Sequence, residues 1–194
     1  MIYLIPVGGM DDEMSRFVRQ RSYRARRRDI SSDEEPLRWL TAPLEERFGY
    51  PCVIGEGVAM PPEAYNPRRG QYLSSAILHA IENKLPPDAL RVLGVANVDL
   101  YVPELNFVFG EAQLGGRVAV ISVARLQPEF YGLEPNPKLA QERMLKEAVH
   151  ELGHTFGLRH CGNEGCVMRF SNSLLDTDRK GADFCPGCKR MLRL

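Results

Sequence analysis

The sequence predicts an α/β (α+β) fold in which short strands alternate with longer helices. Apolar runs bounded by glycine, proline or asparagine are typical of strands. Between them lie longer segments whose apolar residues recur at helical spacing. With 194 residues, the chain fits one domain with a small appendage and can bury a core without disulfides.

The first half of the chain alternates these two patterns. Gly8 and Gly49 mark the ends of a strand and a helix. Cys52 falls in a strand as a small buried hydrophobe, and His79 is a packing or surface residue. In order, we expect a strand over 2–8, a polar helical stretch from Asp11 and Asp12, a helix over 36–50, a strand over 51–60, a loop over 61–70 and an amphipathic helix over 72–84.

The second half begins with three apolar runs, over 91–102, 105–112 and 117–126, which predict strands. Pro137 then stands where a helix of good helix formers begins, and this helix continues to Gly157. Beyond Gly157 the chain is rich in cysteine and glycine, with a short helix within 173–184. This change in composition predicts an N-terminal subdomain over 1–156 and a C-terminal subdomain over 157–194.

Charge and targeting signals indicate a cytoplasmic protein. Lys plus Arg and Asp plus Glu both total 25, so a polyanion is not the expected partner. The basic block 19–28 is followed by acids, which favours a solvated helix face over a nucleic-acid site. The N-terminus lacks the features of a secretory signal, and no stretch of about 18 apolar residues predicts a membrane span. In this compartment, cysteines are more plausible as metal ligands than as disulfides.

A histidine cluster near residue 150 predicts a catalytic metal site. His150 and His154 are four residues apart on a helix, so their side chains lie on one face, about 5–6 Å apart at Cβ. Glu151 lies beside them, where it can accept a proton from a metal-bound water. A surface helix that contains HExxH by chance is the alternative.

The third histidine requires the helix to end. His160 would face away from the other two on a continued helix, but Gly157 permits the left-handed turn that brings it back. Three nitrogen ligands leave one tetrahedral position open for water, as in catalytic zinc sites. We therefore expect His150, His154 and His160 to bind a catalytic zinc ion.

Four cysteines follow the histidines in two close pairs. Cys161 and Cys166 form the first pair, and Cys185 and Cys188 form the second. Two loops that each present two thiolates can close a tetrahedral zinc shell, which is the structural type. Disulfides and a thioredoxin-like CxxC motif are the alternatives. The compartment disfavours the first, and the lack of a strand–helix context disfavours the second.

These motifs together resemble a known family. HELGHTFGLRH (150–160) matches the metzincin consensus, and with CVM (166–168) and CPGC (185–188) it resembles the archaemetzincins in particular. The resemblance extends upstream through RGQYLSSAIL and LNFVFGEA. It implies a zincin-like fold: a mixed twisted sheet with backing helices, an active-site helix, and a small C-terminal subdomain stabilised by the four-cysteine zinc.

The resemblance also implies roles for individual residues. The three histidines would be the catalytic zinc ligands, Glu151 the general base, and Met168 the methionine of the Met-turn beneath the metal. The segment 105–112 would be the sheet edge that flanks the cleft, onto which an extended peptide could add as a further strand. A buried central strand is the alternative for 105–109.

The sequence therefore predicts a monomeric zinc metallopeptidase that acts on a peptide or protein, with one catalytic and one structural zinc ion per chain. Its expected partners include neither nucleic acid nor membrane. Two other functions stay open. One is a zinc amide hydrolase with a non-peptide substrate, and the other is a zinc-stabilised binding module with little catalysis.

Overall fold

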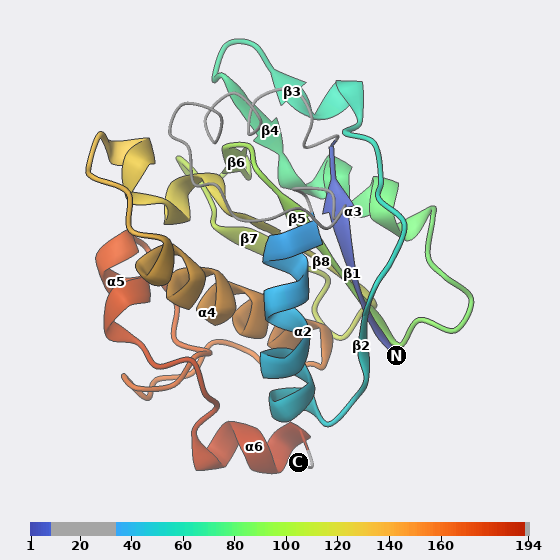
Figure 1. Cartoon of the computed structure of the whole chain (residues 1–194), viewed down its shortest axis with the longest axis vertical. Helices are drawn as coiled ribbons and strands as arrows, with labels where there is room; N and C mark the ends of the chain where they lie inside the picture. Colours follow the sequence, from blue (N-terminus) through green and yellow to red (C-terminus); the bar gives the residue numbers. More distant parts are fainter. Residues whose placement is uncertain (9–33, 193–194) are drawn as a thin grey trace, which may run out of the picture.

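A five-stranded mixed sheet forms the centre of the molecule (Figure 1). The computed structural model describes residues 1–8 and 34–192, so the expected helical stretch from Asp11 and the block 19–28 lie outside the described residues. The strand order is β2-β1-β5-β8-β7, with β7 antiparallel to β8 and the other pairs parallel. The strands are β1 (Ile2–Val7), β2 (Cys52–Ile54), β5 (Arg91–Ala96), β7 (Gly110–Ala112) and β8 (Val118–Ser122).

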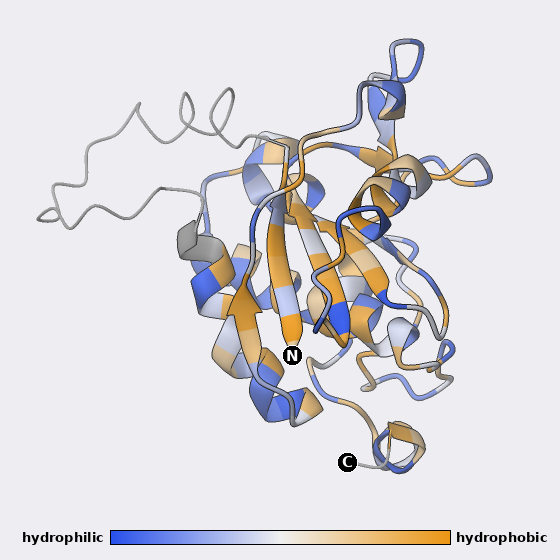
Figure 2. Cartoon of the chain, turned by 90° about the vertical axis from the view of Figure 1, so that its right-hand side faces the viewer, coloured by the Kyte–Doolittle hydropathy of each residue, from blue (hydrophilic) through white to orange (hydrophobic). Residues whose placement is uncertain are grey.

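Helices cover both faces of this sheet. Helices α2 (Glu34–Phe48) and α4 (Pro137–Thr155) pack on one face, and α3 (Ser74–Glu82) packs on the other. Side chains alternate along each strand, so Leu93 belongs to the core under α4 whereas Val92 belongs to the core under α3. Figure 2 shows the resulting apolar strands in the interior. The predicted α/β class, a mixed sheet with backing helices, is confirmed.

Several predicted elements have the expected bounds. Strand β1 ends before Gly8, helix α2 ends before Gly49, and α4 begins at Pro137. Both of these glycines have positive φ, 77° and 70°, a conformation that side chains with a Cβ rarely adopt. Cys52 is buried in β2 and His79 is exposed on α3, as expected.

A second, three-stranded sheet was not predicted. It consists of β3 (Tyr65–Asn66), β4 (Gln71–Leu73) and β6 (Leu100–Tyr101), in the order β3-β4-β6. The segment 61–70 is therefore not only a loop, because it holds a 3₁₀ turn and β3. The helix expected over 72–84 begins at Ser74, because the preceding residues pair as β4. The run 91–102 divides between the two sheets as β5 and β6.

Three predicted strands are shorter in the structure. The strand over 51–60 ends at Ile54, although Gly55 and Val58 still donate backbone hydrogen bonds to β1. A Cβ on Gly55 would lie 2.9 Å from Tyr3 Cδ1, so a side chain there would displace the Tyr3 ring. In the run 105–112 only Gly110–Ala112 forms a strand, and the run 117–126 ends as β8 at Ser122 before a 3₁₀ turn.

The C-terminal segment contains two short helices. Helix α5 (Leu174–Arg179) is shorter than the expected 173–184 and is capped by Ser173, whose side chain accepts the Asp176 N–H. Helix α6 (Pro186–Leu192) was not predicted. It begins at Pro186, because proline's fixed φ suits the first turn of a helix.

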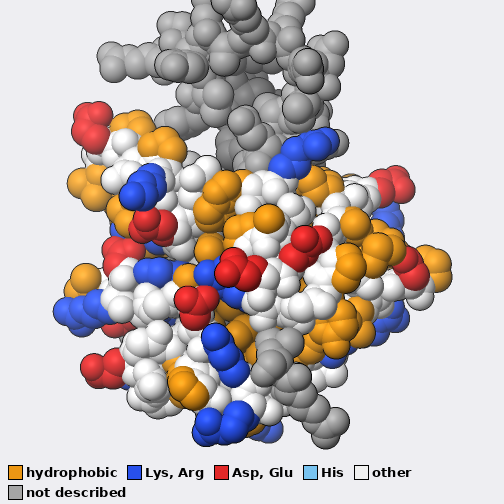
Figure 3. All heavy atoms as spheres, turned by 60° about the horizontal axis from the view of Figure 1, so that its bottom comes forward, with side chains coloured by type: hydrophobic (Ala, Val, Ile, Leu, Met, Phe, Trp, Pro, Cys, Tyr) orange, Lys and Arg blue, Asp and Glu red, His pale blue; other side chains and the backbone are white. Residues whose placement is uncertain are grey.

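The surface of the described residues carries both signs of charge. On the face drawn in Figure 3, Lys and Arg side chains are interspersed with Asp and Glu. Within residues 1–8 and 34–192, none of the helices combines the length and apolar character required to cross a membrane.

Candidate metal centres

Helix α4 and the turn after it bring the three histidines together. The Nε2 atoms of His150 and His154 are 3.0 Å apart, and the chain then turns at Gly157, where φ is 91°. This turn places the His160 ring 5.3 Å from the His150 ring and 4.9 Å from the His154 ring, between centroids. One ligand atom from each histidine lies within 4.8 Å of the others. The bend that the sequence predicted at Gly157 therefore occurs.

Backbone carbonyls orient two of these imidazoles. His150 Nδ1 lies 2.8 Å from the Val167 carbonyl, and His154 Nδ1 lies 2.7 Å from the Leu158 carbonyl. An Nδ1–H that donates to a carbonyl leaves Nε2 unprotonated and directed at the cluster. Burial lowers the pKa of all three histidines, so the neutral, metal-binding form is favoured. The donor set therefore fits a zinc ion with an open position.

Glu151 lies beside the histidine cluster in a desolvated position. Its side chain is only 6% exposed. Burial raises its pKa well above the usual value, and the nearby carboxylate of Glu147 raises it further. Glu151 is not part of the histidine ligand group, so its carboxylate remains available to exchange a proton.

Strand β7 approaches Glu151 so closely that only glycine fits at one position. A Cβ on Gly110 would lie 2.6 Å from Glu151 Cγ and 2.7 Å from the Val120 carbonyl oxygen. We expect Gly110→Ala to displace the Glu151 carboxylate and to cost about 1–3 kcal/mol of folding free energy from overpacking.

The measurement for Gly110→Ala is turnover at equal zinc content, together with thermal unfolding. Gly162→Ala is the matched control, because a Cβ there meets nothing within 4 Å. Equal turnover in the two variants would show that Gly110 does not position Glu151.

The four cysteines form a second cluster in the C-terminal segment. All five cysteines of the chain are free, and the Sγ atoms of these four lie within 4.8 Å of one another. Cys161 Sγ and Cys185 Sγ are 3.8 Å apart, and Cys166 Sγ and Cys188 Sγ are 3.7 Å apart. A backbone hydrogen bond from Cys188 lowers the pKa of Cys185 to about 7, which favours the thiolate. Four converging sulfurs fit a closed tetrahedral zinc shell.

The segment CVM (166–168) connects the two clusters through three successive residues. Cys166 contributes a sulfur to the cysteine cluster, and the Val167 carbonyl contacts His150 Nδ1. Met168 is fully buried beneath α4 against Gly153, where a Cβ would lie 2.5 Å from the methionine sulfur. Met168 therefore packs under helix α4, and its role as the Met-turn methionine stays a prediction.

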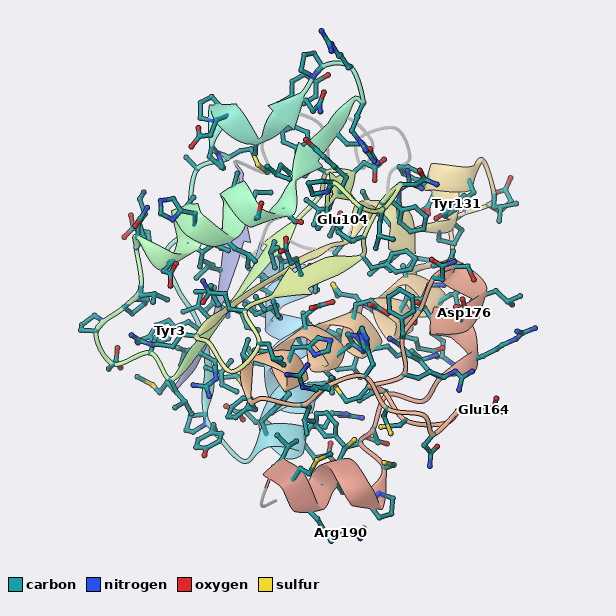
Figure 4. The ribbon with its side chains drawn as sticks, turned by 180° about the vertical axis from the view of Figure 1, so that it is seen from behind. Tyr3, Glu104, Tyr131, Glu164, Asp176 and Arg190 are labelled. Atoms are coloured by element: carbon teal, nitrogen blue, oxygen red, sulfur yellow. The ribbon has the colours of Figure 1, made fainter. Side chains whose placement is uncertain are left out.

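The histidine cluster opens into a cleft of about 570 Å³. Glu104 and Phe107, from the loop between β6 and β7, line one wall, and Phe170 and Ser171, from the segment after Met168, line another. In Figure 4, Glu104 marks the first of these segments and Asp176 marks α5, which follows the second. His150 and Glu151 lie in the same cleft, so a bound molecule can reach the candidate metal centre.

Comparison with known proteins identifies the family. Residues 45–194 match the family model described as peptidase family M54. The chain belongs to this family. It is therefore a zinc metallopeptidase. It is 48% identical over 161 residues to the archaemetzincin of Methanocaldococcus jannaschii, and the match covers 83% of this chain and 87% of the relative.

Solved structures agree with this placement in family M54. The archaemetzincin of Methanopyrus kandleri superposes with a TM-score of 0.77 at 37% identity, covering 100% of this chain and 93% of the other. A zinc-dependent peptidase from Methanocorpusculum labreanum gives a TM-score of 0.79 at 29% identity, covering 99% and 100%. The resemblance to archaemetzincins and the zincin-like fold are confirmed.

Sequence reasoning missed several residues of this M54 site. Glu147 and Lys180 form a buried ion pair behind His150, with 3.0 Å between Oε1 and Nζ. Glu111, which also lines the cleft, accepts a 2.5 Å hydrogen bond from Ser74. Only Glu147 had a sequence signal, because it precedes Glu151 by four residues and so shares its helix face.

Proposed function

We propose that this M54 peptidase hydrolyses peptide bonds at the histidine cluster, with His150, His154 and His160 as ligands of a catalytic zinc ion and Glu151 as the general base. Cys161, Cys166, Cys185 and Cys188 would hold a second, structural zinc ion. The observation that carries this proposal is the convergence of the three imidazoles beside a buried carboxylate in an open cleft. We also propose that residues 157–194 act as the C-terminal subdomain.

Each residue would contribute a separate part of the chemistry. A zinc ion held by the histidines would act as a Lewis acid that lowers the pKa of a water molecule in the open position. Glu151 would serve as the general base that takes a proton from the attacking water and returns it to the leaving amine. The low exposure of Glu151 keeps bulk water away and raises the proton affinity of its carboxylate. A raised proton affinity suits a general base, which must first take a proton and then release it.

The edge strand β7 offers a docking surface for an extended peptide. It is the last strand of the sheet, and Gly110 and Ala112 line the cleft. The Phe109 carbonyl and the Gln113 N–H bond to β8. In an antiparallel ladder the bonded residues alternate, so the N–H and C=O of Gly110 and Ala112 point away from β8. We propose that substrate backbone pairs with these groups.

Ala112 provides the test of edge docking. We expect Ala112→Pro to raise KM, by about tenfold for the loss of one main-chain hydrogen bond, with a smaller effect on kcat. Val108 is unsuitable for this test, because its N–H already donates to the Leu100 carbonyl at 3.0 Å.

Substrates methylated at single backbone nitrogens give the internal control for edge docking. Methylation should weaken binding at alternate positions only, because alternate residues of a strand face its neighbour. The variant must be folded with its full zinc content. An unchanged KM, or a methylation effect without alternation, would exclude β7 as the docking strand.

Peptidase activity itself is tested by exposing the zinc-loaded protein to a random peptide library and sequencing the products by mass spectrometry. New termini that form with the active protein and not with Glu151→Gln would support the proposal. Complete absence of cleavage, together with turnover of small non-peptide amides, would favour a zinc amide hydrolase instead.

A further inference from the structure

The carboxylate of Glu147 is only partly satisfied by the protein. Glu147 lies one turn before Glu151 on α4, lines the cleft and is 3% exposed. Lys180 Nζ and Thr177 Oγ1 both bind its Oε1, at 3.0 and 3.1 Å. Its Oε2 forms no hydrogen bond with a described residue. Because Glu147 lines the cleft, this oxygen can accept a hydrogen bond from a molecule bound there.

The ion pair has a defined orientation. The Lys180 side chain is 1% exposed and lies behind Glu147, with Nζ 3.5 Å from His150 Nδ1. The positive end is therefore inside the protein and the negative end faces the cleft. Lys180 supplies the counter-charge that a carboxylate needs at this buried position.

The rest of the cleft fits a cationic side chain with an apolar stem. Four glutamates line it, and Arg159 is the one Lys or Arg side chain among the described lining residues. Arg159 is exposed, so solvent screens its charge more than that of buried Glu147. Leu105 and Phe107 give apolar walls for methylene groups, and Ser171 Oγ is buried there with no described partner.

We propose that the cleft selects peptides with a lysine or arginine side chain at a residue flanking the cleaved bond, and that Glu147 Oε2 and Ser171 Oγ accept its hydrogen bonds. This inference rests on the proposed peptidase function and adds the class of substrate. Glu147 here is a specificity residue, separate from the proton transfer assigned to Glu151.

The experiment compares three peptides that differ at one flanking position, which is lysine, norleucine or glutamate. For the unmodified protein with its zinc bound, we expect kcat/KM for lysine to exceed that for norleucine by roughly 10- to 100-fold, and glutamate to be cleaved least. The double variant Glu147→Gln/Lys180→Met should reduce the lysine preference to about threefold or less. Both charges are removed together, because Glu147→Gln alone would leave Lys180 buried without a counter-charge.

Two further variants make the comparison specific. Glu142 lies on the exposed face of the same helix, so the variant Glu142→Gln should keep the lysine preference. Ser171→Ala leaves the ion pair intact and should lower the preference by several fold, which tests the proposal even where the double variant does not fold.

The outcomes distinguish failure of this inference from failure of the proposed peptidase function. Cleavage with no preference for lysine or arginine, or a preference that survives both Ser171→Ala and the double variant, would overturn the specificity and leave the peptidase function standing. A preference for glutamate would overturn the proposal and would indicate that Arg159 binds the substrate side chain instead. Absence of any peptide cleavage by the zinc-loaded protein would overturn both.

Discussion

Glu151→Gln is expected to lower peptide turnover by about 10²- to 10⁴-fold while the zinc content stays unchanged. The amide has almost the same shape as the carboxylate, so its packing against Gly110 is kept. It cannot take a proton at neutral pH, which removes the general base. Because Glu151 is not part of the histidine ligand group, the metal site should survive.

The measurement for Glu151→Gln is kcat on an identified substrate, with zinc determined by elemental analysis. Glu142→Gln on the exposed face of the same helix is the matched control. His160→Ala should behave in the opposite way and lose the catalytic metal, because it removes a ligand. If Glu151→Gln kept turnover within about threefold of the unmodified protein, the general base would have to be a different group.

Local sequence was sufficient to predict the histidine cluster, because its geometry is set by one helix and one turn. The spacing of His150 and His154 fixes their relation on α4, and Gly157 adopts the positive φ that the bend requires. The cysteine pairs are likewise local in sequence. The structure brings together the same seven ligand candidates that spacing alone indicated.

The contacts that complete the site are not local and left little trace in the sequence. Lys180 lies 33 residues beyond Glu147, and nothing in its surroundings of charged and polar residues predicts full burial. Gly110 contacts Glu151 only because β7 pairs with β8 beneath α4. Strand lengths failed for the same reason, since pairing partners decide where a strand ends.

Loss of the cysteine-bound zinc is expected to inactivate the protein as well as to unfold its C-terminal segment. A structural zinc ion contributes on the order of 10 kcal/mol to folding. Cys166 is followed at once by Val167, whose carbonyl orients His150, and by Met168, which packs under Gly153. The coupling between the two metal centres should therefore run in one direction only, from the cysteine centre to the histidine centre. Removal of the histidine-bound ion leaves the cysteine shell closed, whereas removal of the cysteine-bound ion disturbs the histidines.

Cys188→Ser tests this one-way coupling, with Cys52→Ser as the control. Both cysteines are buried, but Cys52 lies in β2 outside the cluster. We expect two zinc ions per chain in the unmodified protein and in Cys52→Ser, and a mild chelator should remove the open-site ion first. Cys188→Ser should lose both ions, activity and resistance of residues 157–194 to proteolysis.

A single zinc in the unmodified protein, or a disulfide within the cluster, would contradict the second site. A fully active Cys188→Ser protein would contradict the coupling, because Val167 and Met168 would then hold the histidine site without the metal beneath them.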